Sequence, residues 1–257
     1  MFFTKNSFKS LSVRVLFVLG LALVSACTSP QIETGLNDPW EASNRRAHAF
    51  NKSVDKAFLR PGGNSVGRAI PDPLVTSVGN FADNLSSPGM VVNNLLQADA
   101  KGAFTNSVRF VVNTTIGVGG IFDIATMAGI YEVETDFGET LHVWGAAEGA
   151  YLELPLLGPS TERDTIGRVV DIFTNPLGYV LPKPEKYVGT AANVAKKLVD
   201  RGRYSQTVDS VLYDSADSYA QARSSYLQNR RYQLGGGGDA LADPYDDPYG
   251  AGDPYDN

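Results

Sequence analysis

The chain holds few side chains that could perform catalysis. Its two histidines are His48 and His142, and its single cysteine is Cys27. It contains no Gly-x-Ser-x-Gly motif of a lipase, no His-Glu-x-x-His motif and no Cys-His spacing of a zinc site. Asp164 and Asp171 would lie on one helix face about 10 Å apart, as hydrolytic carboxylates can, but acidic residues are common on exposed faces. We therefore expect no enzyme, no metal and no cofactor, and we expect His142 to be a partly buried packing residue.

A helix with one charged face is the stronger candidate for a functional site. Ser160 or Thr161 can cap this helix, with Glu162 in its first turn. One face carries polar and small residues at helical spacing, namely Asp164, Gly167, Arg168, Asp171 and Asn175. The other face is apolar and carries Ile166, Val169, Val170 and Phe173. This pattern fits an ordinary surface helix with a solvated charged face, and it fits equally a helix that contacts lipid on one side and water on the other.

The amino end has the features of a lipoprotein signal. Lys5, Lys9 and Arg14 precede or begin an apolar run that ends in Val24-Ser25-Ala26-Cys27, which resembles a lipobox. We expect residues 1–26 to be a signal peptide and residues 27–37 to be a lipidated tether. By this resemblance Cys27 would carry diacylglycerol and a further acyl chain. Several acyl chains together would anchor the protein firmly to a membrane. Thr28, which is not Asp, favours the outer membrane as the destination by resemblance to lipoprotein sorting.

Composition excludes further classes of protein. The net charge of −6 becomes −9 without the three positive residues of the signal, so the sequence offers no basic surplus for nucleic acid. No run after the signal reaches the length of a membrane-spanning helix. Residues 234–257 begin with glycines and repeat Asp-Pro-Tyr, so we expect a disordered tail.

The chain between tether and tail, residues 38–233, reads as one all-α domain. Asp38 with Pro39 predicts the start of a first helix that ends before Pro61-Gly62-Gly63. Further helices are expected to begin at Asp72-Pro73, at Ser87-Pro88 and after Lys101-Gly102. Two more regions, 185–201 and 205–233, are also expected to be helical. The glycines between 117 and 120 are expected to form a turn or a close helix contact, because the pattern of a nucleotide-binding loop is incomplete.

Several separated segments resemble the MlaA/VacJ family of outer-membrane lipoproteins. They are Asn37-Asp38-Pro39-Trp40-Glu41, Val92-Asn93-Asn94-Leu95-Leu96-Gln97, Arg109-Phe110-Val111-Val112-Asn113-Thr114-Thr115, Asp136-Phe137-Gly138 and Pro155-Leu156-Leu157-Gly158-Pro159-Ser160. The resemblance covers about residues 37–233. Ser43 and His48 depart from it, because the family usually has aromatic residues there.

The resemblance implies a ring-like bundle of amphipathic helices that lies in the inner leaflet of the outer membrane around a central amphipathic channel. Such proteins associate with trimeric porins, remove mislocalised phospholipids from the outer leaflet and pass them to a soluble periplasmic carrier. A rival interpretation is an adaptor lipoprotein that scaffolds porins or envelope complexes and moves no lipid.

The matching positions give candidate site residues. Lys101, Asp164 and Asp171 correspond to polar channel positions, and Arg163 stands beside them and can pair with Asp164 or meet a phosphate. Arg168 departs from the family, which frequently has an acidic residue there, so the charge balance of a channel is left open. The apolar residues Tyr151, Leu154, Leu156 and Leu157 precede the charged helix, and we expect them in a membrane-level loop at the channel mouth.

Overall fold

The computed structural model describes residues 36–69, 71–180, 182 and 187–236. The predicted signal peptide, Cys27, most of the predicted tether and residues 237–257 lie outside this part of the chain. In chain order the elements are α2 (Glu41–Val54), the π-helical turn η1 (Asp55–Leu59), α3 (Arg60–Ala69), α4 (Asp72–Leu96), α5 (Ala100–Thr115), α6 (Ile124–Met127), α7 (Phe137–Val143), β1 (Tyr151–Leu154), β2 (Gly158–Thr161), α8 (Glu162–Thr174), α9 (Leu177–Val180), α10 (Val188–Arg203), α11 (Ser205–Asp209), the π-helical turn η3 (Ser210–Asp214), α12 (Ser218–Arg231) and the π-helical turn η4 (Tyr232–Gly236).

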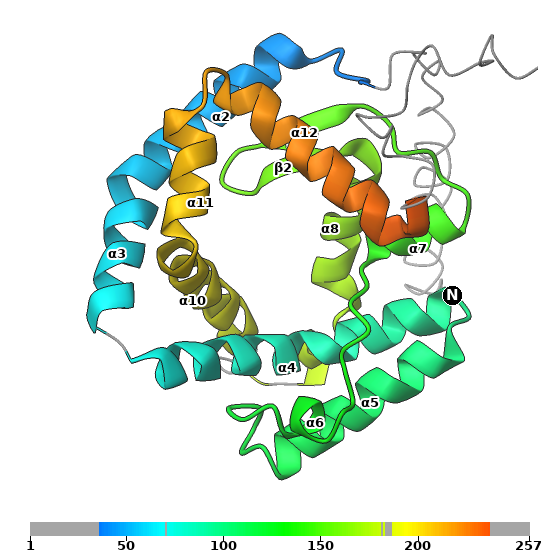
Figure 1. Ribbon diagram of the computed structural model, residues 1–257. Coiled ribbons are helices and arrows are strands. Elements are labelled where there is room, and N and C mark those ends of the chain that lie inside the picture. Colours follow the sequence, from blue (N-terminus) through cyan, green and yellow to red (C-terminus); the bar gives the residue numbers. More distant parts are fainter. Residues whose placement is uncertain (1–35, 70, 181, 183–186, 237–257) are drawn as a thin grey trace, which may run out of the picture.

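The helices are arranged as a ring, which confirms the predicted fold class (Figure 1). In this view α2 and α3 lie on the left, α4 crosses below, α8 lies on the right and α12 crosses above. Helix α5 packs outside α4, and α10 packs against both α3 and α4. Within the described residues, the one departure from an all-α structure is the short antiparallel pair β1–β2, in which Tyr151 lies opposite Thr161.

The first predicted helix does not end before Pro61, and this expectation was wrong. The chain stays helical from Glu41 to Ala69, with η1 between α2 and α3. Pro61 is the second residue after this π-helical turn, where the regular α-helical hydrogen-bond ladder has just been interrupted and a missing N–H costs little. Gly63 is needed because α3 and α10 touch there: a Cβ on Gly63 would lie 2.8 Å from the backbone N of Gly202.

Two further predictions about helix ends fail for reasons that the structure gives. Asp38 does not cap the first helix; its carboxylate accepts hydrogen bonds from Asn44 Nδ2 (2.9 Å), from the Tyr219 hydroxyl and from Arg223, so it joins α2 to α12. Ser87-Pro88 does not start a helix, because α4 continues through Pro88 to Leu96. Contacts hold α4 on both sides of the proline: Lys196 of α10 binds Asp83 before it, and Asn106 of α5 donates to Asn94 after it.

The distribution of side chains is the reverse of that in most water-soluble domains. Among the described residues, polar and charged side chains outnumber hydrophobic ones in the buried set, and half of the buried hydrophobic residues are alanines. Buried apolar side chains form a small cluster of Tyr151, Tyr219 and Leu227, with Tyr226 packed against it. Many large hydrophobic side chains are exposed instead, including Phe104 and Met127. Helices in this structure therefore meet mainly through polar contacts.

Candidate functional site

Helix α8 begins where the sequence predicts, but it follows a β-hairpin. The predicted extended segment folds back on itself, so that β2 leads directly into the helix. Thr161 is the cap: its Oγ1 accepts the backbone N–H of Asp164 at 3.2 Å. The Glu162 carboxylate accepts the N–H of Ala150 at 3.1 Å and so ties the helix start to the base of the hairpin. The hairpin thereby fixes the direction in which the first turn of α8 points.

Asp164, in the first turn of the charged face of α8, is buried against α12. Asp164 is 4% exposed, and its carboxylate accepts hydrogen bonds from the Tyr226 hydroxyl (2.6 Å) and from Arg230 Nη2 (3.1 Å). Burial alone would raise the pKa of Asp164, but the Tyr226 hydroxyl and the Arg230 cation outweigh it and lower this pKa. Arg230 also donates to Asp136 Oδ1 at 2.7 Å. We call these four side chains, Asp136, Asp164, Tyr226 and Arg230, the charged junction.

One turn further along α8, the backbones of two helices touch. A Cβ on Gly167 would lie 2.3 Å from the backbone N of Gly138 in α7. Only glycine permits this approach, which explains a helical glycine on an otherwise polar face. The contact brings α7 close enough for Asp136, which caps α7, to reach Arg230.

Asp171 occupies the far end of the same face and has a different environment. Its Oδ1 accepts a hydrogen bond from Asn93 Nδ2 at 2.9 Å, and its Oδ2 accepts the backbone N–H of Phe137 at 3.1 Å. Burial raises the pKa of Asp171, and these two neutral donors only partly offset it. Asp171 therefore joins α8 to α4 and α7, and no arginine hydrogen bond to it is found among the described residues.

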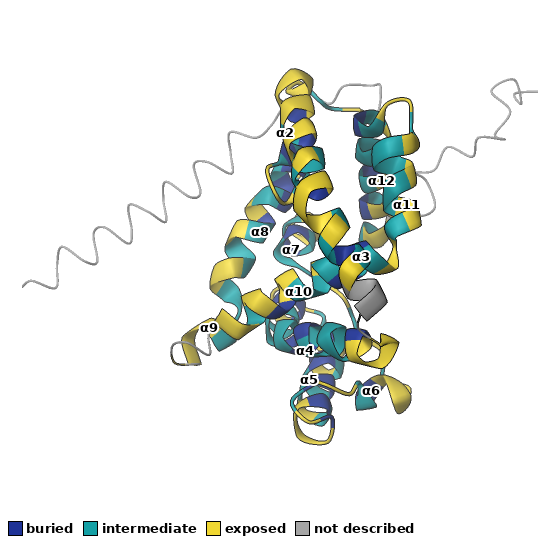
Figure 2. Ribbon diagram, turned by 90° about the vertical axis from the view of Figure 1, so that its left-hand side faces the viewer, coloured by how far each residue is buried: buried dark blue, intermediate teal, exposed yellow. Residues whose placement is uncertain are grey.

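The apolar face of α8 is exposed. The exposed fraction is 53% for Val169, 75% for Ile172 and 64% for Phe173. Figure 2 shows exposed segments on α8 and on α9, which follows it. The interpretation of α8 as an ordinary surface helix with a solvated charged face is therefore wrong, because the charged face is the one that packs.

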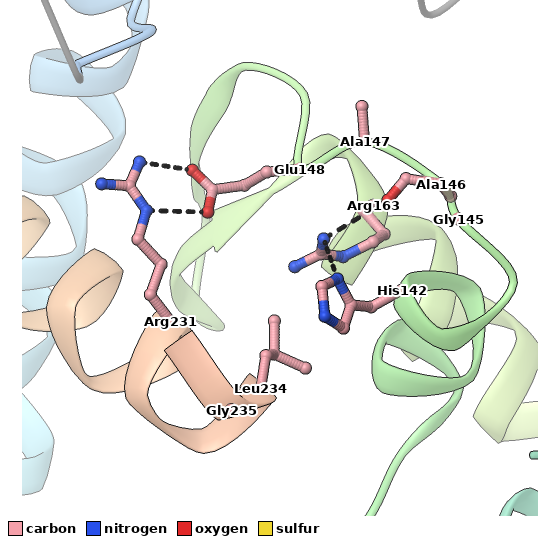
Figure 3. Close-up of a pocket in the computed structure, with 9 residues that line it drawn as sticks. All are labelled: His142, Gly145, Ala146, Ala147, Glu148, Arg163, Arg231, Leu234 and Gly235. Carbon is pink, nitrogen blue, oxygen red and sulfur yellow. Dashed lines mark hydrogen bonds and ion pairs between the residues drawn. The ribbon is translucent and has the colours of Figure 1, made fainter. Parts of the chain in front are cut away.

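A pocket of about 540 Å³ lies beside the first turn of α8, between α7, the segment 145–148 and the end of α12 (Figure 3). Arg163 lines it and is 5% exposed. Its Nη1 lies 3.4 Å from His142 Nδ1 and 3.5 Å from the carbonyl oxygen of Ala146. His142 itself is exposed, so the expectation of a partly buried packing residue was wrong. Across the pocket, Glu148 accepts two hydrogen bonds from Arg231, at 2.8 and 3.0 Å.

Comparison with known proteins identifies the family. The family model for the MlaA lipoprotein matches residues 36–233. The chain belongs to the MlaA lipoprotein family.

Characterised relatives and a solved structure agree with this assignment. The intermembrane phospholipid transport system lipoprotein MlaA of Escherichia coli is 31% identical over 226 residues, which cover 85% of this chain and 87% of that protein. The protein of the same name in Haemophilus influenzae is 30% identical, with 78% of this chain and 80% of that protein covered. A solved structure, described as the structural basis for maintenance of bacterial outer membrane lipid asymmetry, is similar with a TM-score of 0.66 and 30% identity over 77% of this chain and 98% of that one.

The structure of this MlaA-family chain separates the predicted site residues. Asp164 and Asp171 lie along one face of α8 and Arg163 precedes Asp164 in its first turn, whereas Lys101 is exposed in the first turn of α5. Arg168 is half-buried, and its Nη2 donates to the carbonyl oxygen of Pro159 at 3.0 Å. Its positive charge therefore faces the hairpin carbonyls.

The predicted mouth loop is the β1–β2 hairpin, and only its tip is exposed. Tyr151 is 1% exposed in the apolar core, so its assignment to a membrane-level loop was wrong, and Leu154 is half-buried. Leu156 and Leu157 are 67% and 53% exposed at the tip. Asn51 of α2 holds this tip: its Nδ2 donates to the Leu154 carbonyl oxygen at 3.0 Å, and its Oδ1 accepts the Leu156 N–H at 2.7 Å.

Sequence reasoning missed the partners of the predicted residues. Tyr226 and Arg230 stand four residues apart on α12, a spacing that places both on one face toward Asp164. This spacing is visible in the sequence, but no local pattern pairs α12 with α8. Asn93 lies in a segment that resembles the family, yet its link to Asp171 is equally long-range.

Two absences apply to the described part of the chain. Within it, no helix combines the length and the hydrophobicity that crossing a membrane requires. In the same residues, no group of three His, Cys, Asp or Glu side chains is placed to hold a metal ion.

Proposed function

We propose that this protein removes mislocalised phospholipids from the outer leaflet of the outer membrane and passes them to a soluble periplasmic carrier. Family membership supports this function, because relatives are named intermembrane phospholipid transport system lipoproteins. A transport role of this kind needs no catalytic residue and no cofactor. The acyl chains on Cys27, once residues 1–26 are removed, would anchor the protein on the periplasmic side.

The observation that carries the proposal is the exposed apolar face of α8, whose polar face packs against neighbouring elements. In water, an amphipathic helix packs its apolar face and solvates its charged one. The reverse orientation is stable where the surroundings are acyl chains, and exposed apolar surface of this kind marks membrane or protein contact. Phe104 and Val111 expose apolar side chains on a second helix, α5. We therefore place the ring in the inner leaflet, held by its own surface as well as by its lipid.

A phospholipid headgroup would need a polar passage through the ring. We retain Lys101, Arg163, Asp164 and Asp171 as candidates to line it. Lys101 is exposed, Asp171 is half-buried, and Arg163 and Asp164 are buried in helix contacts. Asp164 would therefore act by positioning α8 and α12, unless the charged junction opens during transport. The exposed tip at Leu156 and Leu157 would lie at the membrane-facing mouth.

Porins are the proposed partners within the membrane. A trimeric porin presents an apolar outer wall, which would match apolar surface of the ring that lipid does not cover. The soluble carrier would meet the periplasmic side. An adaptor that only scaffolds porins would need the same surface, so the transport of lipid itself must be measured.

The deciding experiment measures phospholipid exposed on the cell surface of a strain that lacks this protein. Plasmids restore either the wild type or Cys27→Ala, and immunoblots of membrane fractions give the amount of each protein. We expect surface phospholipid to accumulate in the deletion strain, to fall with the wild type and to stay high with Cys27→Ala. Unchanged surface phospholipid in the deletion strain would favour the adaptor.

A second experiment tests the lining residues. The double variant Asp164→Asn and Asp171→Asn removes both charges and keeps the side-chain volumes, and Arg168→Gln serves as a control on the same helix. We expect membrane attachment to be unchanged and lipid removal to slow in the double variant alone. Removal at the normal rate would exclude both carboxylates from the passage.

A further inference from the structure

We propose that the pocket beside the start of α8 binds the phosphate of a phosphate ester through the guanidinium of Arg163. The proposal rests on the proposed function only where the ester is a phospholipid. Figure 3 shows the Arg163 guanidinium between His142 and the space bounded by Glu148 and Leu234. In Figure 1, α7 and the end of α12, which frame the pocket, lie on the right-hand side of the ring.

Arg163 differs from the other buried arginines in the described part of the chain. Arg109, Arg201 and Arg230 each donate to a carboxylate oxygen, at 3.1, 2.6 and 2.7 Å respectively. Arg163 has no such bond: Asp164 Oδ1, with which it forms its ion pair, is 3.7 Å from its Nε. That carboxylate already accepts from Tyr226 and Arg230.

One donor that remains on Arg163 is aimed into the pocket. Its Nε and Nη2 are buried and make no hydrogen bond. Nε faces Asp164 Oδ1 at 3.7 Å, whereas Figure 3 shows Nη2 directed toward the space beside Leu234 and Glu148. Nη2 can therefore donate a charge-assisted hydrogen bond to an oxygen of a phosphate. A buried cation whose counter-ion lies 3.7 Å away and accepts no hydrogen bond from it is only partly compensated, so an anion bound here would be stabilised.

Neither charged or titratable neighbour of Arg163 in the pocket, Glu148 or His142, supplies it with a counter-ion. The Glu148 carboxylate is engaged by both Nε and Nη2 of Arg231. The nearer ring nitrogen of His142, Nδ1, must accept when it meets Arg163 Nη1, because a guanidinium only donates. The His142 proton is then on Nε2, which adds a second donor at the rim of the pocket.

The size and lining of the pocket favour an ester over a bare ion. About 540 Å³ is far more than one phosphate group fills, and Ala147 and Leu234 add apolar side chains to the lining. A phosphate linked to glycerol and the first carbons of acyl chains would place its charge at Arg163 and its apolar part against Leu234.

Binding is measured by calorimetry on the full-length acylated protein in dodecyl maltoside. The three probes are dihexanoylphosphatidylglycerol, inorganic phosphate and dihexanoylglycerol, which lacks the phosphate. We expect the phospholipid to bind, and Arg163→Gln to weaken it at least about tenfold. Arg168→Gln, on the same helix, should leave binding unchanged, because Arg168 donates to backbone carbonyls. Arg163→Lys should keep part of the affinity.

A second pair of variants leaves Arg163 in place. Leu234→Glu would supply an internal carboxylate opposite the guanidinium and compete with the phosphate, whereas Leu234→Gln has the same shape without the charge. We expect only Leu234→Glu to weaken binding and to raise the unfolding temperature. This pair tests the pocket even if Arg163→Gln does not fold.

The probes separate the possible sources of the anion. Phospholipid binding that exceeds phosphate binding identifies a lipid site, and equal binding of both identifies a site for free phosphate that leaves the proposed function untouched. Binding of dihexanoylglycerol as tight as that of the phospholipid, or phospholipid binding unchanged in Arg163→Gln and Leu234→Glu, would overturn the proposal. Normal lipid removal by Arg163→Gln in cells, despite lost binding, would place the pocket off the transport route and would not contradict transport.

Discussion

Two of the polar contacts that hold helices together in this protein differ in the kind of group that they bury. The charged junction joins α7, α8 and α12 through Asp136, Asp164, Tyr226 and Arg230. A second contact, which we call the amide junction, consists of Asn94, Asn106 and Asn113 between α4, α5 and the chain that follows α5.

The amide junction is built on neutral side chains, although Asn113 Nδ2 donates to the Asp123 carboxylate at 2.9 Å and Asn94 Nδ2 donates to that of Asp99 at 3.4 Å. Asn106 Nδ2 donates to Asn94 Oδ1 (2.9 Å) and to the Val133 carbonyl oxygen (2.8 Å), and its Oδ1 accepts the Val133 N–H (3.1 Å). Asn113 Oδ1 accepts the N–H of Ala125 at 2.9 Å. These amides fasten the segment 125–133 onto α5, whereas the charged junction joins helices more than 60 residues apart. Amides do not titrate, so the two contacts should respond differently to mutation and to pH.

The largest loss of stability is expected from Arg230→Met. The change leaves the buried Asp164 carboxylate without its cation, and breaking such a pair typically costs about 3–5 kcal/mol. The measurement is the free energy of unfolding in denaturant, in a mild detergent. Arg168→Met is the matched control, because it removes an arginine of α8 that binds only carbonyl oxygens. A loss of less than about 1 kcal/mol in the free energy of unfolding for Arg230→Met would show that water solvates the Asp164 carboxylate in place of Arg230.

A smaller loss is expected from Asn106→Ala in the amide junction. It leaves the Val133 N–H and Asn94 Oδ1 without partners, which costs about 1–3 kcal/mol in a buried contact. Ser107→Ala, at the next residue of α5, removes only a hydroxyl bond to the Ala103 carbonyl oxygen and serves as control. The comparison of the two junctions would fail if Asn106→Ala cost as much as Arg230→Met.

The pH dependence of stability should separate the two ends of α8. The pKa of Asp164 is lowered in the folded state, so its contribution is present above the unfolded pKa of about 3.9 and is lost as pH falls through the folded value. The pKa of Asp171 is raised, so stability falls as pH rises from about 3.9 through the folded value.

Unfolding measured between pH 3 and pH 7 tests these opposite signs. Asp171→Asn loses one acceptor at every pH, but its deficit relative to the wild type should shrink as pH rises. Asp164→Asn should show a deficit that grows over the same range. Asn106→Ala should show a deficit that does not change with pH, and parallel curves for all three variants would refute the assignment.

The smallest effect on stability is expected from Phe173→Ser on the exposed apolar face of α8. An exposed side chain contributes within about 0.5 kcal/mol to folding, but burying a phenylalanine in lipid contributes about 1.5–3 kcal/mol. We expect unchanged unfolding in detergent and weaker flotation with liposomes when the Cys27→Ala background removes the anchor. Lys197→Ser, at an exposed polar position of α10, is the control. Equal flotation of both variants would remove α8 from the membrane-binding surface.

In this protein the sequence predicts where helices start and which residues share a face better than it predicts what each face contacts. The start of α8 at Thr161 and its two faces follow from capping and periodicity, and both are found. Periodicity cannot show which face packs against protein, because an apolar helix face is compatible with lipid as well as with a protein core. Pro61 and Pro88 misled the prediction, since a π-helical turn and packing on both sides keep these helices continuous. The pairing of Asp164 with Arg230 spans 66 residues and has no local signal.

The exposed hydrophobic side chains and the buried polar ones have a calorimetric consequence. Unfolding normally raises the heat capacity by about 12–15 cal/mol/K per residue, because apolar exposure raises it and polar exposure lowers it. In this protein many large apolar side chains are exposed before unfolding, and the buried set is mostly polar. The heat-capacity increment per residue should therefore fall below that range, and the curve of stability against temperature should be unusually flat.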